Sequence, residues 1–107
     1  MLEVDVNIHE KGTEIDVIDY DTGAEYLANV GTVYGIRLRR AYPDKSVERK
    51  IIELLFHNVS DRARDDLKFI AESFDLKGKM TSDEHHRKQN RYSLTLPVDS
   101  KIEIKVD

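Results

Sequence analysis

The beginning of the chain alternates strictly between apolar and polar side chains. The apolar members of this alternation are Leu2, Val4, Val6 and Ile8. A period of two residues is that of a β-strand with one buried and one solvent-facing side. With Lys11-Gly12 as a two-residue turn, Ile15 falls opposite Ile8. Val17 then falls opposite Val6, so the sequence predicts an N-terminal β-hairpin whose apolar faces match.

Residues 22–41 allow two interpretations. In the first, Asp21-Thr22-Gly23 is a turn and two further strands follow, which makes the N-terminal part a four-stranded meander. In the second, residues 22–41 form one helix, because Thr22-x-x-Glu25 matches a capping box and helical apolar spacing follows. Gly31 and Gly35 would each cost a helix interior about 1 kcal/mol relative to alanine. We therefore favour the strands.

The middle of the chain predicts two helices. The first begins near the candidate cap Ser46. Its apolar stripe consists of Val47, Ile51, Leu54 and Leu55. The second follows the candidate N-cap Ser60. Its apolar stripe consists of Ala63, Leu67, Ile70 and Phe74. This spacing predicts two packed helices that cover the sheet.

Residues 75–90 are polar, with Leu76 and Met80 as their apolar anchors. A connection of this length is uncommon inside a compact domain unless it is mobile or functional. Residues 92–96 and 102–106 alternate again and predict a hairpin. We therefore predict a single α+β domain over residues 1–107: an N-terminal antiparallel β-meander, two central helices, a polar, mobile loop at 75–90 and a C-terminal β-hairpin.

Composition excludes several classes of site. The chain has no cysteine, which removes disulfides, thiol nucleophiles and zinc sites built on sulfur. No histidine pair has the i, i+4 spacing of a zinc site, and no glycine-rich phosphate loop is present. No run approaches the roughly 18 apolar residues of a membrane span, and the first residues do not resemble a signal peptide. We expect a cytoplasmic protein with no cofactor, no metal and no membrane contact.

The charge is unevenly distributed along the chain, although its net value is only −4. Residues 1–25 are acidic and residues 37–50 are basic. An acidic face that binds a protein partner would consist of Glu3, Asp5, Glu14, Asp16, Asp19 and Asp21. A nucleic-acid surface would consist of Arg37, Arg39, Arg40, Arg49 and Lys50, with Tyr34 and Tyr42 stacking on bases. The alternative for the basic segment is that it pairs with the acids of residues 1–25 within one sheet, which the acidic pI of about 5.6 favours.

Two short motifs raise a hydrolase alternative. Asp21-Thr22-Gly23 resembles the catalytic tripeptide of aspartic proteases, and the resemblance implies that Asp21 would pair with the same residue of a second subunit. Asp19-x-Asp21 resembles the nucleophile strand of haloacid-dehalogenase-type phosphatases, which implies a metal-dependent reaction. A hairpin turn explains the same residues, and we favour it because acidic Asp19 precedes the tripeptide where the proteases have an apolar run.

No catalytic set with convergent spacing emerges from these motifs. We therefore expect a small, non-enzymatic protein-interaction or regulatory module that uses a charged sheet face or a strand edge. The strand edge makes a homodimer an expected assembly. The first alternative is a nucleic-acid-binding protein that uses the basic segment 37–50, and the second is a hydrolase, either aspartic-protease-like or metal-dependent.

Overall fold

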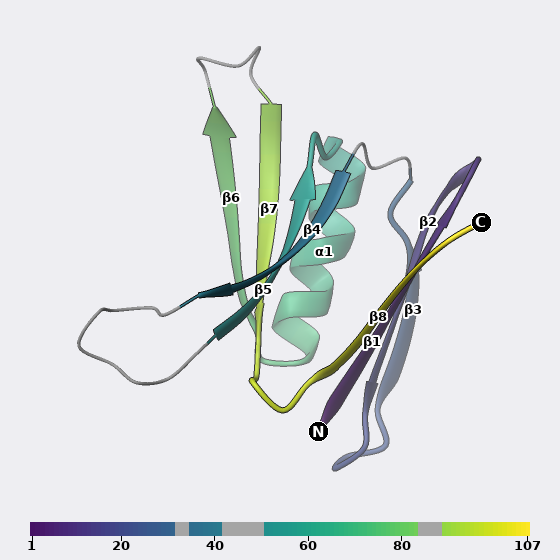
Figure 1. The fold of residues 1–107 in the computed structure, drawn as a ribbon, viewed down its shortest axis with the longest axis vertical. Coiled ribbons are helices and arrows are strands. Elements are labelled where there is room, and N and C mark those ends of the chain that lie inside the picture. The colour runs from purple at the N-terminus through teal and green to yellow at the C-terminus, as the bar shows by residue number, and fades with distance from the viewer. Residues whose placement is uncertain (32–34, 42–50, 84–88) are drawn as a thin grey trace.

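Two β-sheets and a helix make up the described part of the protein. The computed structural model describes residues 1–31, 35–41, 51–83 and 89–107. Sheet A has strand order β3-β2-β1-β8. Its strands are β1 (Leu2–His9), β2 (Gly12–Asp19), β3 (Glu25–Asn29) and β8 (Lys101–Val106). Sheet B has strand order β4-β5-β7-β6. Its strands are β4 (Gly35–Ala41), β5 (Ile51–His57), β6 (Lys77–Asp83) and β7 (Gln89–Leu96). Figure 1 shows the arrangement of the two sheets and the helix, and one hydrophobic core contains buried residues of both sheets.

The N-terminal hairpin forms as the alternation predicted, but in a different register. Val6 pairs with Ile15, Val4 pairs with Val17, and residues 10 and 11 form the turn. The predicted register placed each apolar residue two positions away from its actual partner. A shift of two residues keeps every side chain on the same face of the sheet, so the apolar pattern does not distinguish the two registers.

The first predicted helix is wrong within the described residues, because residues 51–57 form strand β5. Ile52, Leu54 and Phe56 are buried, whereas Leu55 is half-buried on the opposite side of the strand. The helical stripe required Leu54 and Leu55 on one face. The β-branched pair at the start of this segment and the alternation at residues 52, 54 and 56 fit a strand better. Val47 and Ser46 lie outside the described residues.

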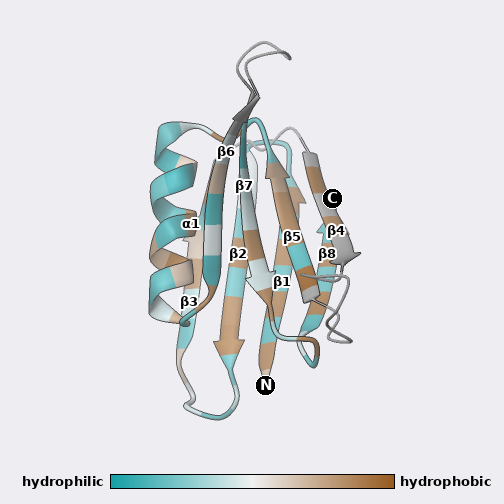
Figure 2. Ribbon diagram, turned by 90° about the vertical axis from the view of Figure 1, so that its left-hand side faces the viewer, coloured by the Kyte–Doolittle hydropathy of each residue, from teal (hydrophilic) through white to brown (hydrophobic). Residues whose placement is uncertain are grey.

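The helix that does form is α1 (Asp61–Ser73), as its cap and stripe predicted. The Ser60 side chain accepts a hydrogen bond from the backbone N–H of Ala63 at 3.1 Å. Ala63, Leu67 and Ile70 are fully buried against the core. The helix contacts β3, β6 and β7, and it covers the side of the two sheets where the edge strands β3 and β6 lie (Figure 2). Edge strands β4 and β8 lie on the opposite side.

The C-terminal half corrects two further predictions. Residues 77–83 of the expected polar loop form strand β6, whereas residues 84–88 lie outside the described residues. The expected C-terminal hairpin does not form, because β7 pairs with β5 and β6 in sheet B and β8 pairs with β1 in sheet A. Alternation identifies a strand and its buried side, but it does not identify the neighbouring strand.

The predicted fold class is therefore corrected to two packed, mostly antiparallel sheets with one helix among the described residues. Two central helices are not observed there, and the four-stranded N-terminal meander is wrong because β4 lies in sheet B. The strand interpretation of residues 22–41 is correct for residues 25–29 and 35–41. This arrangement gives each sheet an outer face that the other sheet does not cover.

Candidate functional site

The outer face of sheet A is built from the polar half of the alternation that forms β1 and β2. Every second residue points into the core, so the residues between them point outward. We use the name acidic face for the outward carboxylates of sheet A, which are Glu3, Asp5, Glu14, Asp16, Glu25 and Glu103.

A line of carboxylates crosses three neighbouring strands of this face. Asp5 of β1 lies directly opposite Asp16 of β2. On its other side Asp5 lies opposite Glu103 of β8. Side chains in directly opposite positions have Cβ atoms roughly 5 Å apart, and like charges there destabilise the sheet. Repulsion between these carboxylates therefore destabilises the folded protein.

The pKa values of Asp5 and Asp16, the two carboxyls at the middle of this line, are both raised. Partial burial raises the pKa of Asp5, and the charge of Glu3 raises it further. Partial burial also raises the pKa of Asp16, followed by the hydrogen bond and the charge of Glu25. The Oδ1 atom of Asp16 is buried and has no hydrogen-bond partner in the described part of the chain. These carboxyls are held in positions that disfavour their charged form.

The basic residues of sheet A that neighbour the acidic face lie on the edge strand β8 and at the end of β1. His9 Nε2 lies 3.8 Å from Glu14 Oε2. Lys105 Nζ lies 3.5 Å from Glu103 Oε1. Among the described residues, no lysine, arginine or histidine forms an ion pair with the four central acids. These acids are Glu3, Asp5, Asp16 and Glu25. The centre of the face therefore has no ion pair within the described chain, although Lys101 of β8 lies directly opposite Glu3 and the charge of Lys105 partly offsets the rise in the pKa of Asp5.

Two larger side chains accompany the carboxylates. The Tyr20 hydroxyl donates a hydrogen bond to Glu3 Oε2, and this bond is the main cause of the raised pKa of Tyr20. Leu27 pairs across the strands with Asp16 and is 62% exposed. The face thus combines an excess of negative charge with exposed apolar surface.

The structure brings together four of the six acids that the sequence predicted for this face. They are Glu3, Asp5, Glu14 and Asp16. Asp19 is instead the last residue of β2 and Asp21 lies in the turn that follows, where Asp19 Oδ1 accepts a hydrogen bond from the backbone N–H of Asp21 at 2.9 Å. Sequence reasoning did not include Glu25 and Glu103. The signal for Glu103 was its place in the alternating segment Lys101–Val106, but its position beside β1 depends on a parallel pairing of distant strands.

Asp21-Thr22-Gly23 forms the hairpin turn that we favoured. Gly23 has a φ of 77°, in the left-handed region that favours glycine. Its N–H donates to the Asp19 carbonyl at 2.7 Å. The Asp21 carboxylate lies 2.5 Å from the amino group of Met1. Asp21 therefore lies in an exposed turn and is held by a local ion pair.

The predicted basic segment belongs to the other sheet. Arg37 pairs with Leu55, Arg39 with Glu53 and Arg40 with Ile52 across β4 and β5. The remaining predicted members, Tyr34, Tyr42, Arg49 and Lys50, lie outside the described residues. The predicted charge pairing within one sheet is wrong for Arg37, Arg39 and Arg40, because β4 lies in sheet B whereas β1 and β2 lie in sheet A.

The outer face of sheet B carries the opposite charge. Lys77 and Lys79 of β6 and Arg91 of β7 occupy outward positions of this face. A shallow cavity of about 270 Å³ opens on it. The lining residues are Glu53, Leu55, Lys79, Thr81, Arg91 and Ser93. Leu55 and Glu53, which line this cavity, pair with Arg37 and Arg39 of β4. The two outer faces of the molecule therefore differ in charge.

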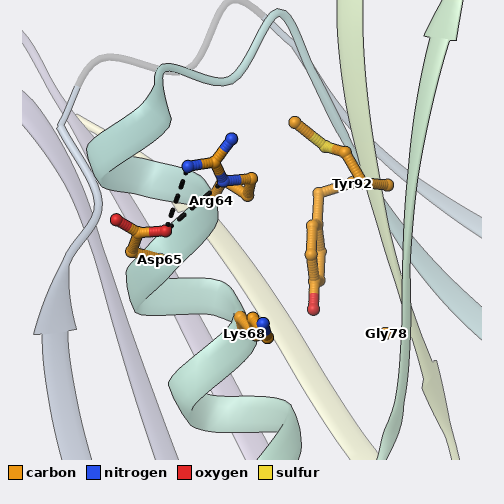
Figure 3. A pocket seen from close by; sticks show the side chains of 6 residues that line it. Arg64, Asp65, Lys68, Gly78 and Tyr92 are labelled. Carbon is orange, nitrogen blue, oxygen red and sulfur yellow. Dashed lines mark hydrogen bonds and ion pairs between the residues drawn. The ribbon is translucent and has the colours of Figure 1, made fainter.

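Another cavity, of about 350 Å³, lies between α1 and strands β6 and β7 (Figure 3). Arg64 projects into it from the helix but is paired with Asp65 at 3.3 Å and with Asp61 at 3.4 Å. Tyr92 stands beside Gly78, where an added Cβ would lie 2.8 Å from the ring carbon Cζ. Tyr92, which approaches β6 closely, is one of the lining residues of this cavity. The charge of Arg64 is balanced by Asp61 and Asp65.

Among the described residues, no group of three histidine, aspartate or glutamate side chains is placed to hold a metal ion. The helix within the described ranges is too short and too polar to cross a membrane. Comparison with protein families, characterised proteins and solved structures finds no significant match.

Proposed function

We propose that this protein is a non-enzymatic interaction module and that its acidic face binds a basic segment of a partner protein. The observation that carries the proposal is the directly opposed pair Asp5 and Asp16, flanked by acids and without an ion-pair partner in the described chain. Folding alone gives no reason to place like charges opposite each other at half-buried positions.

A cationic partner would relieve this arrangement. Lysine or arginine side chains that lie between Asp5, Asp16 and Glu25 would replace repulsion by attraction. Partial burial of these acids lowers the local dielectric, which strengthens each such contact relative to a fully exposed pair. The charge of the whole face also steers a basic partner toward it and accelerates association.

The exposed apolar groups narrow the class of partner. Leu27 is 62% exposed and Tyr20 is 57% exposed. Tyrosine is one of the side chains most often found at the energetic centre of protein interfaces. A basic segment that also carries apolar side chains fits this face better than a purely cationic polymer. The absence of cysteine supports our proposal that this binding takes place in the cytoplasm.

The experiment is a titration of the protein with a labelled peptide in which lysine and leucine alternate. The test variant is Asp5→Asn with Asp16→Asn, and the matched control is Glu10→Gln with Asp99→Asn, which removes the same charge from exposed turns. We expect the dissociation constant to rise roughly ten-fold in the test variant, about 1.4 kcal/mol, and by less than about two-fold in the control. Equal losses in both variants would mean that the peptide responds to net charge and not to this face.

The outer face of sheet B supports a second candidate function, which is nucleic-acid binding. Lys77, Lys79 and Arg91 make this face cationic, and Arg37 and Arg39 of β4 pair with Leu55 and Glu53 of β5. Binding of labelled single-stranded and double-stranded DNA and RNA, at low and physiological salt, tests this function. Affinity should fall steeply with salt and weaken in the Arg37→Ala, Arg39→Ala variant. No binding at low salt would exclude it.

A further inference from the structure

Strand β8 is an edge strand of sheet A. Charged and apolar residues alternate along its sequence in an order that is complementary to the same sequence read in the opposite direction. Its outward row alternates in charge as Lys101, Glu103 and Lys105. Its other row is apolar and contains Ile102, Ile104 and Val106. Ile104 is 36% exposed and Val106 is 73% exposed. In the described structure β8 pairs with β1 on one side, and no described strand pairs with its other side.

The backbone groups of the apolar row point toward that unpaired side. The N–H of Asp107 donates to the carbonyl of Ile8 in β1 at 3.0 Å. The direction of backbone N–H and C=O groups alternates along a strand. The groups of the odd-numbered residues of β8 therefore point to β1, whereas those of Ile102, Ile104 and Val106 point away from it. An exposed row of this kind is a template for another strand.

We propose that two copies of this chain pair through their β8 strands in antiparallel orientation, with Ile104 opposite Ile104 of the second copy. In this register Ile102 lies opposite Val106 of the second copy, so apolar residues meet apolar residues. Glu103 lies opposite Lys105 of the second copy, so opposite charges meet. The same symmetry places Lys101 opposite Asp107. The Ile104 pair lies on the two-fold axis, and each of the other matched pairs occurs twice around it.

Neighbouring registers that keep the faces aligned do not have this complementarity. Centring the pairing on Glu103 would place Glu103 opposite itself and Lys101 opposite Lys105. Centring it on Lys105 would place two lysines opposite each other. Centring it on Ile102 would place Ile104 opposite Ser100 and Val106 opposite the turn that precedes β8. The proposed register is the one that satisfies both the charges and the apolar row.

The other edge strands are less suited to pairing with their own copy. Strand β4 carries arginines at positions 37, 39 and 40 without an intervening acid. Strand β6 starts with Lys77 and Lys79. Strand β3 is the shortest described strand and is covered in part by α1. Repeated positive charge on an edge strand opposes self-association. The inference is independent of the proposed function, but in such a dimer sheet A would continue across both copies with the two acidic faces on one side.

Two single charge reversals test the register. In the Glu103→Lys variant two lysines would lie opposite each other at both of the 103–105 pairs, and in the Lys105→Glu variant two glutamates would do so. We expect the wild-type protein to sediment as a dimer and each variant to sediment as a monomer, with the dimer dissociation constant raised at least roughly ten-fold. An equimolar mixture of the two variants restores opposite charges at both contacts, because one chain then supplies two lysines and the other two glutamates, so the mixture should form a heterodimer. The double variant exchanges the two charges, restores opposite charges at both pairs and should dimerise as the wild type does.

The double variant serves as the folding control, because it carries both substitutions and is expected to recover the dimer. Monomeric wild-type protein at the highest soluble concentration would overturn the proposal. Dimerisation of both single variants with unchanged affinity would also overturn it, since the dimer would then use another surface. Failure of the double variant to dimerise, while its circular dichroism spectrum matches that of the wild type, would overturn the register.

Discussion

Replacement of Asp16 by asparagine is expected to stabilise the protein at neutral pH. Asp16 lies directly opposite Asp5, beside Glu25, and its Oδ1 atom is buried without a partner in the described chain. Asp16→Asn removes the charge while keeping the shape of the side chain. The asparagine side chain also has an amide N–H that can donate a hydrogen bond to a neighbouring carboxylate.

The size of the effect follows from the neighbours of Asp16. A like-charge pair at directly opposite positions costs about 0.2–1 kcal/mol. Taking the middle of this range for Asp5, which is directly opposite, and a smaller share for the diagonal neighbour Glu25 gives a gain of about 1 kcal/mol in the free energy of unfolding. For a domain of this length, 1 kcal/mol corresponds to an increase of about 4 °C in the midpoint temperature. High salt should reduce the gain, because it screens charges at this separation.

The pH dependence gives an independent check. Partial burial and neighbouring carboxylates raise the pKa values of Asp5 and Asp16 in the folded protein. The folded protein therefore binds these protons more tightly than the unfolded chain does. The stability that they contribute is fully present below the ordinary carboxyl pKa and is lost as the pH rises through the raised pKa. The advantage of Asp16→Asn over the wild type should accordingly shrink as the pH is lowered toward about 4.

Thermal unfolding followed by circular dichroism, at neutral and acidic pH and at two salt concentrations, measures all three effects. Glu10→Gln removes one carboxylate from the exposed β1–β2 turn and is the matched control, for which we expect little change. If Asp16→Asn unfolds at a lower temperature than the wild type at neutral pH, the Asp16 carboxylate makes a favourable interaction and the reasoning about the acidic face is refuted.

Two further predictions concern the scaffold. Ser60→Ala removes the acceptor for the Ala63 N–H and should lower the free energy of unfolding by about 1 kcal/mol in denaturant titrations, whereas Ser73→Ala at the other end of α1 should have little effect. Gly78→Ala should cost about 1–3 kcal/mol, because the added Cβ meets the buried ring of Tyr92, and the cost should decrease when Tyr92→Phe removes the nearest atom. An unchanged stability of Gly78→Ala would show that the ring can move away.

Much of the local structure could be predicted from the sequence. Strict alternation identified β1 and β2, and a cap followed by an apolar stripe identified α1. The segment at residues 51–57 was misassigned because its apolar residues fit a period of two as well as a helical spacing. Its β-branched residues and its pairing with β7 decide in favour of the strand. Local spacing therefore fails where a segment is apolar on both sides.

The candidate site was predictable only in part, for a related reason. The acids of β1 and β2 follow from the alternation, because both strands belong to one hairpin. Glu103 joins them only because β8 returns from sheet B to pair in parallel with β1. Sheet order depends on contacts between distant parts of the chain, and periodicity contains no information on them. For the same reason the sequence analysis wrongly predicted that residues 35–41, which form β4, continue the N-terminal meander beside β1 and β2.

The central claim is that the acidic face of sheet A binds a basic segment, and amide chemical-shift mapping during titration with the alternating lysine–leucine peptide tests it most directly. We expect the largest shifts at the backbone amides of Asp5, Asp16 and Leu27, with sheet B unaffected. Shifts confined to sheet B, or spread evenly over all exposed acids including those of the turns, would contradict the claim.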